Sequence, residues 1–201
     1  MVCGVAGGVR REEGMACLVT PTVAVHESFL AAMSEFRAEG RGRTDDVSMI
    51  GYDHQAYGST WHTPDGFAAY VADVVAQSRE DAPRPRGWVP ATTLWLVEGA
   101  EYLGRIQLRH RLTEFLREVG GHIGYDVRPS ARLNGHATLM LRGMLPVARV
   151  LGIDPALVTC DSGNVGSRKV IEKCGGELED ERNGKLRFWV PTMDSESPQA
   201  G

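Results

Sequence analysis

Two segments of the chain, residues 26–40 and 65–79, repeat their apolar residues with the period of an amphipathic helix. The apolar positions are Phe29, Leu30, Met33 and Phe36 in the first segment and Phe67, Tyr70, Val71, Val74 and Val75 in the second. Gly40 is a suitable end for the first helix. Between the two, residues 41–64 follow no period, and we expect a long loop there.

The rest of the chain reads as strands separated by two more helices. Strands are expected at residues 17–25, 91–99, 101–112, 120–129 and 155–161, helices from about 136 to 151 and at 164–176, and a hairpin at 176–191 turning on Asn183-Gly184. Pro146 should kink the longer of these helices, and Gly175 should end the other. This order predicts a mixed α/β (α+β) domain with a largely antiparallel sheet flanked by helices.

Composition is that of a globular protein with a single domain. The chain has 201 residues and a net charge of -4, which argues against sequence-independent nucleic-acid binding. No apolar run approaches the roughly 18–20 residues that span a bilayer, so no membrane partner is expected. Residues 1–16 read as a disordered leader, 17–191 as the domain, and 192–201 as a disordered tail.

The four cysteines lie far apart along the chain, at Cys3, Cys17, Cys160 and Cys174. Such spacing matches neither a zinc site nor a disulfide framework. We therefore expect no metal, and free thiols in a reducing, cytoplasmic environment.

The stretch Arg-Leu-Asn-Gly-His-Ala at residues 132–137 stands where a strand passes into a helix. The first N–H groups of a helix lack internal partners and, with the helix dipole, attract an anion. Gly135 would let a phosphate approach the backbone, and Arg132 would add a fork of donors. An ordinary loop-to-helix transition explains the same residues equally well.

These residues resemble the R/Q-x-x-G-x-G/A signature of the GNAT (Gcn5-related) N-acetyltransferases. Residues 121–132 resemble the splayed central strand of that family, and residues 158–176 resemble its later strand and Asn-x-x-Ser/Ala helix. The resemblance covers about residues 91–190. It implies a GNAT-like mixed sheet and acetyl-CoA as the cofactor.

The resemblance also implies which residues hold acetyl-CoA. Its diphosphate would lie on Arg132, Leu133, Asn134, Gly135, His136, Ala137 and Thr138. Its pantetheine arm would pair with the strand from Tyr125 to Val127, and an N–H near Val127 would polarise the thioester carbonyl. Asn164 and Ser167 match cofactor-contacting positions, although Asn164 also suits a helix N-cap and Ser167 the start of a helix.

Catalysis by direct attack of an amine in a ternary complex needs the ammonium to lose a proton. The resemblance makes Glu118 and His122 candidates for the base, with a purely structural histidine as the alternative. The family's usual general-acid tyrosine is absent, since Ile171 occupies that position. Residues 41–64 are acidic and aromatic, and they either receive a cationic amine or form a solvated loop.

The resulting hypothesis is acetyl transfer from acetyl-CoA to a primary amine of a small molecule. Three alternatives stay open: another acyl-CoA or acyl-carrier donor, a non-catalytic acyl-CoA-binding module, and acetylation of protein termini or lysines. The expected partner is thus a small amine, without nucleic acid or membrane. The sequence leaves a homodimer open.

Overall fold

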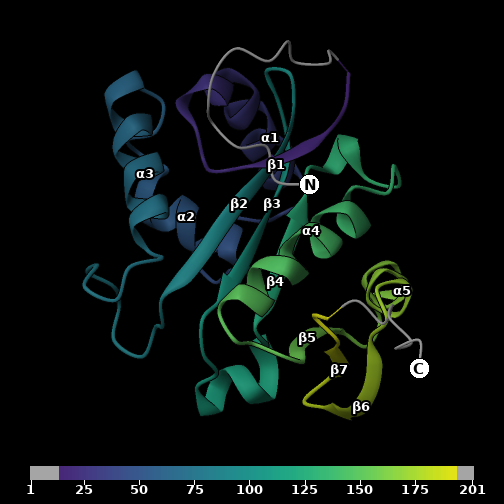
Figure 1. Ribbon diagram of the computed structural model, residues 1–201. Helices are drawn as coiled ribbons and strands as arrows, with labels where there is room; N and C mark the ends of the chain where they lie inside the picture. The colour runs from purple at the N-terminus through teal and green to yellow at the C-terminus, as the bar shows by residue number, and fades with distance from the viewer. Residues whose placement is uncertain (1–13, 194–201) are drawn as a thin grey trace, which may run out of the picture.

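Residues 14–193, the part of the chain that the computed structural model describes, form a seven-stranded sheet with helices on both faces (Figure 1). The strands are β1 (Cys17–Val19), β2 (Ala91–Glu98), β3 (Glu101–Arg109), β4 (Ile123–Val127), β5 (Ala156–Asp161), β6 (Glu177–Arg182) and β7 (Lys185–Val190). The helices are α1 (His26–Ala38), α2 (Met49–Tyr57), α3 (Pro64–Ala76), α4 (His136–Val150) and α5 (Val165–Lys173). Short 3-10 turns occupy Val23–Val25 and Pro129–Ala131, and a π-helical turn occupies Leu116–Gly120.

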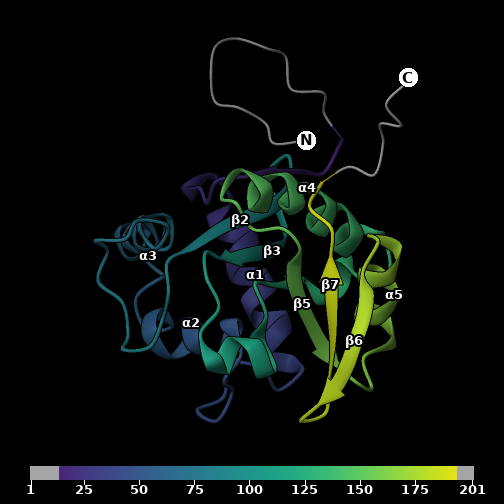
Figure 2. The ribbon, with the colours of Figure 1, turned by 60° about the horizontal axis from the view of Figure 1, so that its bottom comes forward.

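The strand order is β1-β2-β3-β4-β5-β7-β6, and every neighbouring pair is antiparallel except β4 and β5. The predicted mixed, largely antiparallel sheet is therefore confirmed. β4 pairs with β3 from Ile123 to Val127, but it pairs with β5 only at Ile123 and Val158. The two parallel strands separate beyond that point, as expected for a splayed central strand. β5, β7 and β6 continue the sheet beside α5 (Figure 2).

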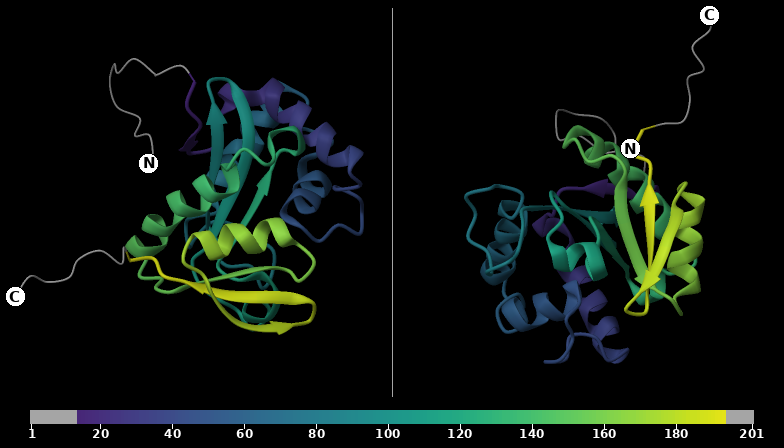
Figure 3. Two further views of the ribbon diagram at one scale, coloured as in Figure 1. Left: turned by 90° about the vertical axis from the view of Figure 1, so that its right-hand side faces the viewer. Right: turned by 90° about the horizontal axis from the view of Figure 1, so that it is seen from below.

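Side chains of the central strands alternate between two hydrophobic cores, one on each face of the sheet. In β2, Leu94 and Leu96 belong to the core under α4 and α5, whereas Trp95 and Val97 belong to the core under α1, α2 and α3. The left view of Figure 3 shows the sheet between α4 on one side and α1 and α2 on the other. Trp95 is fully buried.

The prediction of a long loop at residues 41–64 is wrong, because α2 lies inside it. Ser48 caps this helix by accepting the N–H of Gly51 at 3.2 Å, and Ile50 is fully buried. The stability of a helix this short comes from tertiary contacts rather than from an apolar period. The first predicted strand is likewise shorter than expected, since β1 ends at Val19 and Thr22 caps a 3-10 turn.

Other predicted elements lie where the sequence places them. The hairpin of β6 and β7 turns on Asn183 and Gly184, both with positive φ, and Gly175 follows α5 with φ +83°. α4 continues through Pro146 to Val150. No helix within residues 14–193 combines the length and apolar character needed to cross a membrane.

The ends of the chain lie partly outside the described residues. The expected leader falls mostly in residues 1–13, and the expected tail mostly in 194–201, so these boundaries stay predictions. Thr192, the first residue of that tail, is 6% exposed. Its backbone N–H donates to Asp154 Oδ1 at 2.9 Å, so the described chain is still anchored at this point.

A buried ion pair joins α2 to the sheet. The carboxylate of Asp53, 5% exposed, accepts hydrogen bonds from Arg105 on β3, 3% exposed, and from the Tyr70 hydroxyl of α3 at 2.7 Å. Burial and then the charge of Asp53 raise the pKa of Tyr70, which stays protonated. This carboxylate is fully engaged in packing and is not available to a ligand.

Replacing Asp53 by alanine should destabilise the fold by about 3–5 kcal/mol, because it leaves the Arg105 charge buried without a partner. Urea unfolding followed by circular dichroism measures the effect. Asp45→Ala is the control, since the side chain of Asp45 is 79% exposed and pairs only with an exposed Arg43. Equal losses of stability in the two variants would contradict this assignment.

Candidate functional site

A groove of about 460 Å³ opens where β4 leaves β5, between the starts of α4 and α5. Of the residues predicted from the sequence, Tyr125, Val127, Arg132, Leu133, Gly135, His136, Ala137, Thr138, Asn164 and Ser167 line it. Arg41, Asp126, Gly166 and Val170 complete the lining. The structure therefore brings together residues that are up to 129 positions apart, from Arg41 to Val170.

The backbone of β4 presents polar groups to this groove. The N–H of Arg128 donates to Leu103 at 2.9 Å, and the carbonyl of His122 accepts from Arg109 at 2.8 Å. The backbone N–H and C=O groups of even-numbered residues in β4 therefore point towards β3. Those of Tyr125 and Val127 point to the opposite side, where β5 has separated from β4. An extended ligand can pair with these groups as an added strand would.

The N-terminus of α4 opens onto the same groove. Gly135, the N-cap, has φ +80° and no side chain caps the helix, whose first turn has no acidic residue. The first helical bond runs from the Leu139 N–H to the Gly135 carbonyl at 3.0 Å, so the amides of residues 136–138 point out of the helix end. A Cβ on Gly135 would meet no atom within 4 Å, so the space above it is open. This arrangement suits a phosphate.

Side chains of the loop before α4 make it stiff. Asn134 Nδ2 donates to the Ala131 carbonyl at 3.3 Å, and His136 Nδ1 lies 3.0 Å from the same oxygen. Because a carbonyl only accepts, Nδ1 of His136 carries the proton, and its Nε2 is left as an acceptor while the ring is neutral. Asn134 is absent from the groove lining and supports the loop instead. Leu133, with φ +66° and a fully exposed side chain, is a strained position at the groove mouth.

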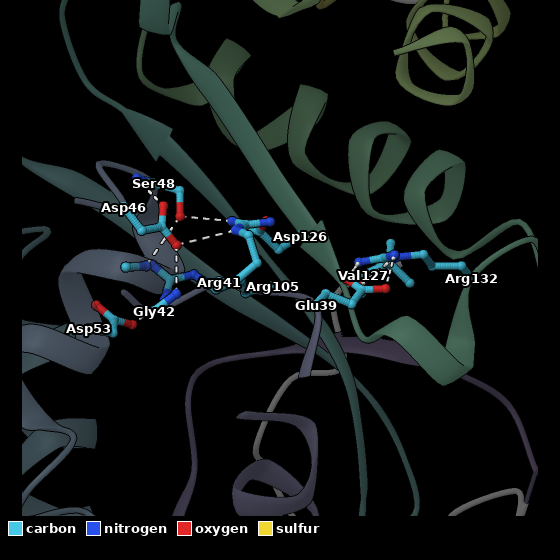
Figure 4. A network of polar contacts seen from close by, with 11 residues as sticks. Glu39, Arg41, Gly42, Asp46, Ser48, Asp53, Arg105, Asp126, Val127 and Arg132 are labelled. Carbon is cyan, nitrogen blue, oxygen red and sulfur yellow. Dashed lines mark hydrogen bonds and ion pairs between the residues drawn. The ribbon is translucent and has the colours of Figure 1, made fainter. Parts of the chain in front are cut away.

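Arg132 reaches the groove but is already paired. Its guanidinium donates twice to Glu39, with Nη1–Oε1 and Nη2–Oε2 both at 2.7 Å, and its Nε lies 3.4 Å from the Val127 carbonyl (Figure 4). Glu39 is the C-cap of α1, directly after the last helical residue. Glu39 thus neutralises the cation that is expected to bind phosphate.

The α5 side of the groove combines a helix cap with a phenol. Asn164 Oδ1 accepts the Ser167 N–H at 3.0 Å, which confirms the N-cap interpretation while Asn164 also lines the groove. Tyr125 Oη lies 3.5 Å from the Ser167 carbonyl. Burial raises the pKa of Tyr125 to about 12, so the phenol stays protonated at neutral pH. Ile171 is fully buried and offers no proton donor.

A polar network closes the other side of the groove, on the face covered by α2. Arg41 Nη2 donates to Asp126 Oδ1 at 3.1 Å and to Ser48 Oγ at 2.8 Å, and its Nε contacts Asp46 at 3.4 Å (Figure 4). Burial alone would raise the pKa of Asp46, but hydrogen bonds from Ser48 and Gly42 and the charge of Arg41 lower it. Arg41 and Asp126 were not predicted as site residues. An acidic residue inside a central strand was the available signal for Asp126.

The two predicted bases lie outside the groove lining. Glu118 belongs to the π-helical turn, and its Oε1 pairs with Arg182 Nη1 at 3.2 Å on the surface. His122 is 8% exposed, and its Nδ1 accepts the N–H of Leu157 at 2.9 Å. The His122 N–H donates to the Leu157 carbonyl at 2.7 Å, so this residue binds β4 to β5 just before they separate.

A second hollow, of about 510 Å³, lies at the start of α1 and is a weaker candidate. Arg128 lines it, but this guanidinium already pairs with Glu35 at 2.7 Å and with Glu101 at 3.0 Å. The groove beside β4 has unpaired backbone groups as well as side chains. We therefore regard it as the functional site.

The chain resembles known proteins in both sequence family and fold. Residues 43–177 match the acetyltransferase (GNAT) domain model. The chain is similar in fold to Mycobacterium smegmatis RimJ in complex with CoA-disulfide (TM-score 0.60, 16% identity, covering 89% of this chain and 83% of that one).

Two further solved structures have the same fold. One is the ribosomal-protein-S5-alanine acetyltransferase from Vibrio fischeri (TM-score 0.59, 14% identity, 94% of this chain and 98% of that one). The other is the microcin C7 self-immunity acetyltransferase MccE in complex with acetyl-CoA and AMP (TM-score 0.56, 12% identity, 90% and 97%). No curated protein sequence matches the chain.

The burial of His122 should make stability depend on pH. Burial first, and then the charges of Arg117 and Arg109, lower the pKa of His122 to about 4. Between that value and its ordinary pKa of about 6.5, the unfolded chain binds more protons, so stability is lost as pH falls through this window. His122→Asn, whose Oδ1 can still accept the Leu157 N–H, should reduce this slope by up to about 1.4 kcal/mol per pH unit.

Urea unfolding at a series of pH values from 4 to 7 measures the slope in each protein. His62→Asn is the control, because His62 is exposed. The assignment fails if the His122 and His62 variants keep the same pH dependence as the wild type.

Proposed function

Because the chain belongs to the GNAT family of acetyltransferases and is an acyltransferase, we propose that it transfers an acetyl group from acetyl-CoA to a small-molecule amine. The amine attacks the thioester directly in a ternary complex. The observation that carries the proposal is the junction of two sets of backbone groups, the free amides at the start of α4 and those of Tyr125 and Val127.

The donor fits this junction by its chemistry. The diphosphate oxygens accept hydrogen bonds from the amide N–H groups of residues 136–138, and the pantetheine arm, with its two amides, pairs with Tyr125 and Val127. The N–H of Val127 stabilises the negative charge that develops on the thioester oxygen. Acetyl-CoA and CoA accompany two of the similar structures, which supports the choice of donor.

Asp126 is the carboxylate that lines the groove, and we assign it to the acceptor's ammonium group. Its Oδ1 is held by Arg41, while no hydrogen bond to Oδ2 is found within residues 14–193. Arg41 lines the groove on this side and pairs with Asp126 at 3.1 Å, and we take this pair to favour a small acceptor over an extended peptide. For Glu118 or His122 to act as the base, each would first have to leave its present partner.

Departure of the thiolate needs a proton donor or a solvent proton. Tyr125 lines the groove and keeps its phenol proton, and Ser167 lies beside it. We assign Tyr125 as the donor in place of the tyrosine that the sequence lacks at Ile171.

Gly135→Asp should raise the Kd for CoA at least tenfold, as measured by calorimetry. The new carboxylate repels the diphosphate, and φ +80° is strained for any residue with a side chain. Gly152→Asp is a matched control, because Gly152 also has positive φ and open space but lies beyond the other end of α4. Unchanged CoA affinity in the Gly135 variant would refute the donor site.

A panel of small amines and N-terminal peptides, with CoA release as the signal, tests the acceptor. We expect turnover of small cationic amines and a KM for them raised about tenfold by Asp126→Asn, since the variant removes the charge that attracts ammonium. Asp65→Asn, at the exposed start of α3, is the control. Turnover confined to peptides would contradict the small-molecule proposal, and a panel of acyl-CoAs would identify a different donor.

A further inference from the structure

The pair formed by Glu39 and Arg132 occupies the groups that the donor needs. The two terminal nitrogens of the Arg132 guanidinium, Nη1 and Nη2, each donate a hydrogen bond to Glu39. The Nε of Arg132 donates to the Val127 carbonyl. That carbonyl faces the gap beside β4, and Arg132 lines the groove. Arg132 therefore lies across the end of β4, and Glu39 offsets its charge.

The ion pair between Glu39 and Arg132 can break at a small cost in free energy. The side chains of Arg132 and Glu39 are 43% and 40% exposed, and ion pairs as exposed as this one contribute little to stability. A diphosphate offers a guanidinium the same two-oxygen geometry as a carboxylate, with more negative charge. The helix dipole of α4 favours the diphosphate further, whereas Glu39 lies on the segment that ends α1.

We propose that Glu39 competes with the diphosphate of the donor for Arg132 and so sets the donor's affinity. The inference rests on the proposed function, because it takes CoA as the ligand. Glu39 is a positioning residue that acts on the donor through Arg132. When CoA binds, both hydrogen bonds to Glu39 break, and the guanidinium turns from Glu39 and the Val127 carbonyl to the phosphate oxygens.

This exchange also links the two sides of the groove. Glu39 stands two residues before Arg41, whose side chain holds Asp126. One short segment at the end of α1 therefore contacts the donor side through Glu39 and the acceptor side through Arg41. The donor removes the first contact and leaves the second, so the Arg41–Asp126 pair stays in place when the donor binds.

Calorimetry with CoA on a double-mutant cycle tests the competition. Glu39→Gln should lower the Kd for CoA about two- to fivefold, the range set by an exposed ion pair. Arg132→Gln should raise the Kd, and Glu39→Gln should have no further effect in that background, because the partner is gone. Pantetheine, which lacks the diphosphate, should bind the wild type and Glu39→Gln equally.

Glu35→Gln is the matched control. It removes the same charge from the same helix and breaks a 2.7 Å pair with Arg128, which does not line the groove. An equal gain in CoA affinity in this control, or a gain that persists without Arg132, would show a general charge effect and overturn the inference.

The two proposals fail in different ways. A wild type that binds CoA, with unchanged or weaker affinity in Glu39→Gln, overturns the competition and leaves the proposed function intact. A wild type that binds no CoA overturns the proposed function and this inference with it.

Discussion

The groove depends on the separation of β4 from β5 after a single residue pair. Backbone N–H and C=O groups inside a sheet are normally paired, and leaving them unpaired away from water costs free energy. The separation is therefore confined to one place. His122 makes two hydrogen bonds to Leu157 just before it, and Gly121, with φ +63°, packs where a Cβ would lie 2.6 Å from the Leu157 carbonyl oxygen.

The same groove separates opposite charges between its two faces. The start of α4 contributes amides and Arg132, which suit an anion, while the face covered by α2 contributes Asp126, which suits a cation. An anionic ligand and a cationic one would thus be attracted to different sides of one strand. Arg41 offsets the negative charge on the acidic side, since it forms ion pairs with Asp126 and Asp46.

The sequence predicted what depends on local pattern. The helix at residues 26–40, the hairpin at Asn183-Gly184 and the Gly-containing start of α4 each follow from periodicity or turn chemistry, and all are present in the structure. The sequence did not predict α2, because the buried Asp53 and the N-cap Ser48 stabilise this helix and neither produces an apolar period.

Predicting side-chain partners was harder than predicting elements. Ten of the residues named from the family resemblance line the groove, because the path of the backbone through β4 and the starts of α4 and α5 determines their positions. Pairs such as Glu39–Arg132 and Arg41–Asp126 join residues about 90 positions apart, and no spacing along the chain indicates them. The family resemblance made Glu118 and His122 candidates for the base, yet Glu118 pairs with Arg182 on the surface and His122 accepts the Leu157 N–H.

The gap beside β4 makes the sheet incomplete by about one strand's worth of hydrogen bonds over Tyr125 to Val127. A ligand that fills it supplies from outside what the polypeptide omits, and so contributes to the cohesion of the fold as well as to chemistry. Saturation with such a ligand raises the unfolding temperature by mass action. A ligand bound there would complete the hydrogen bonding of β4, and its release would leave these backbone groups without that partner again.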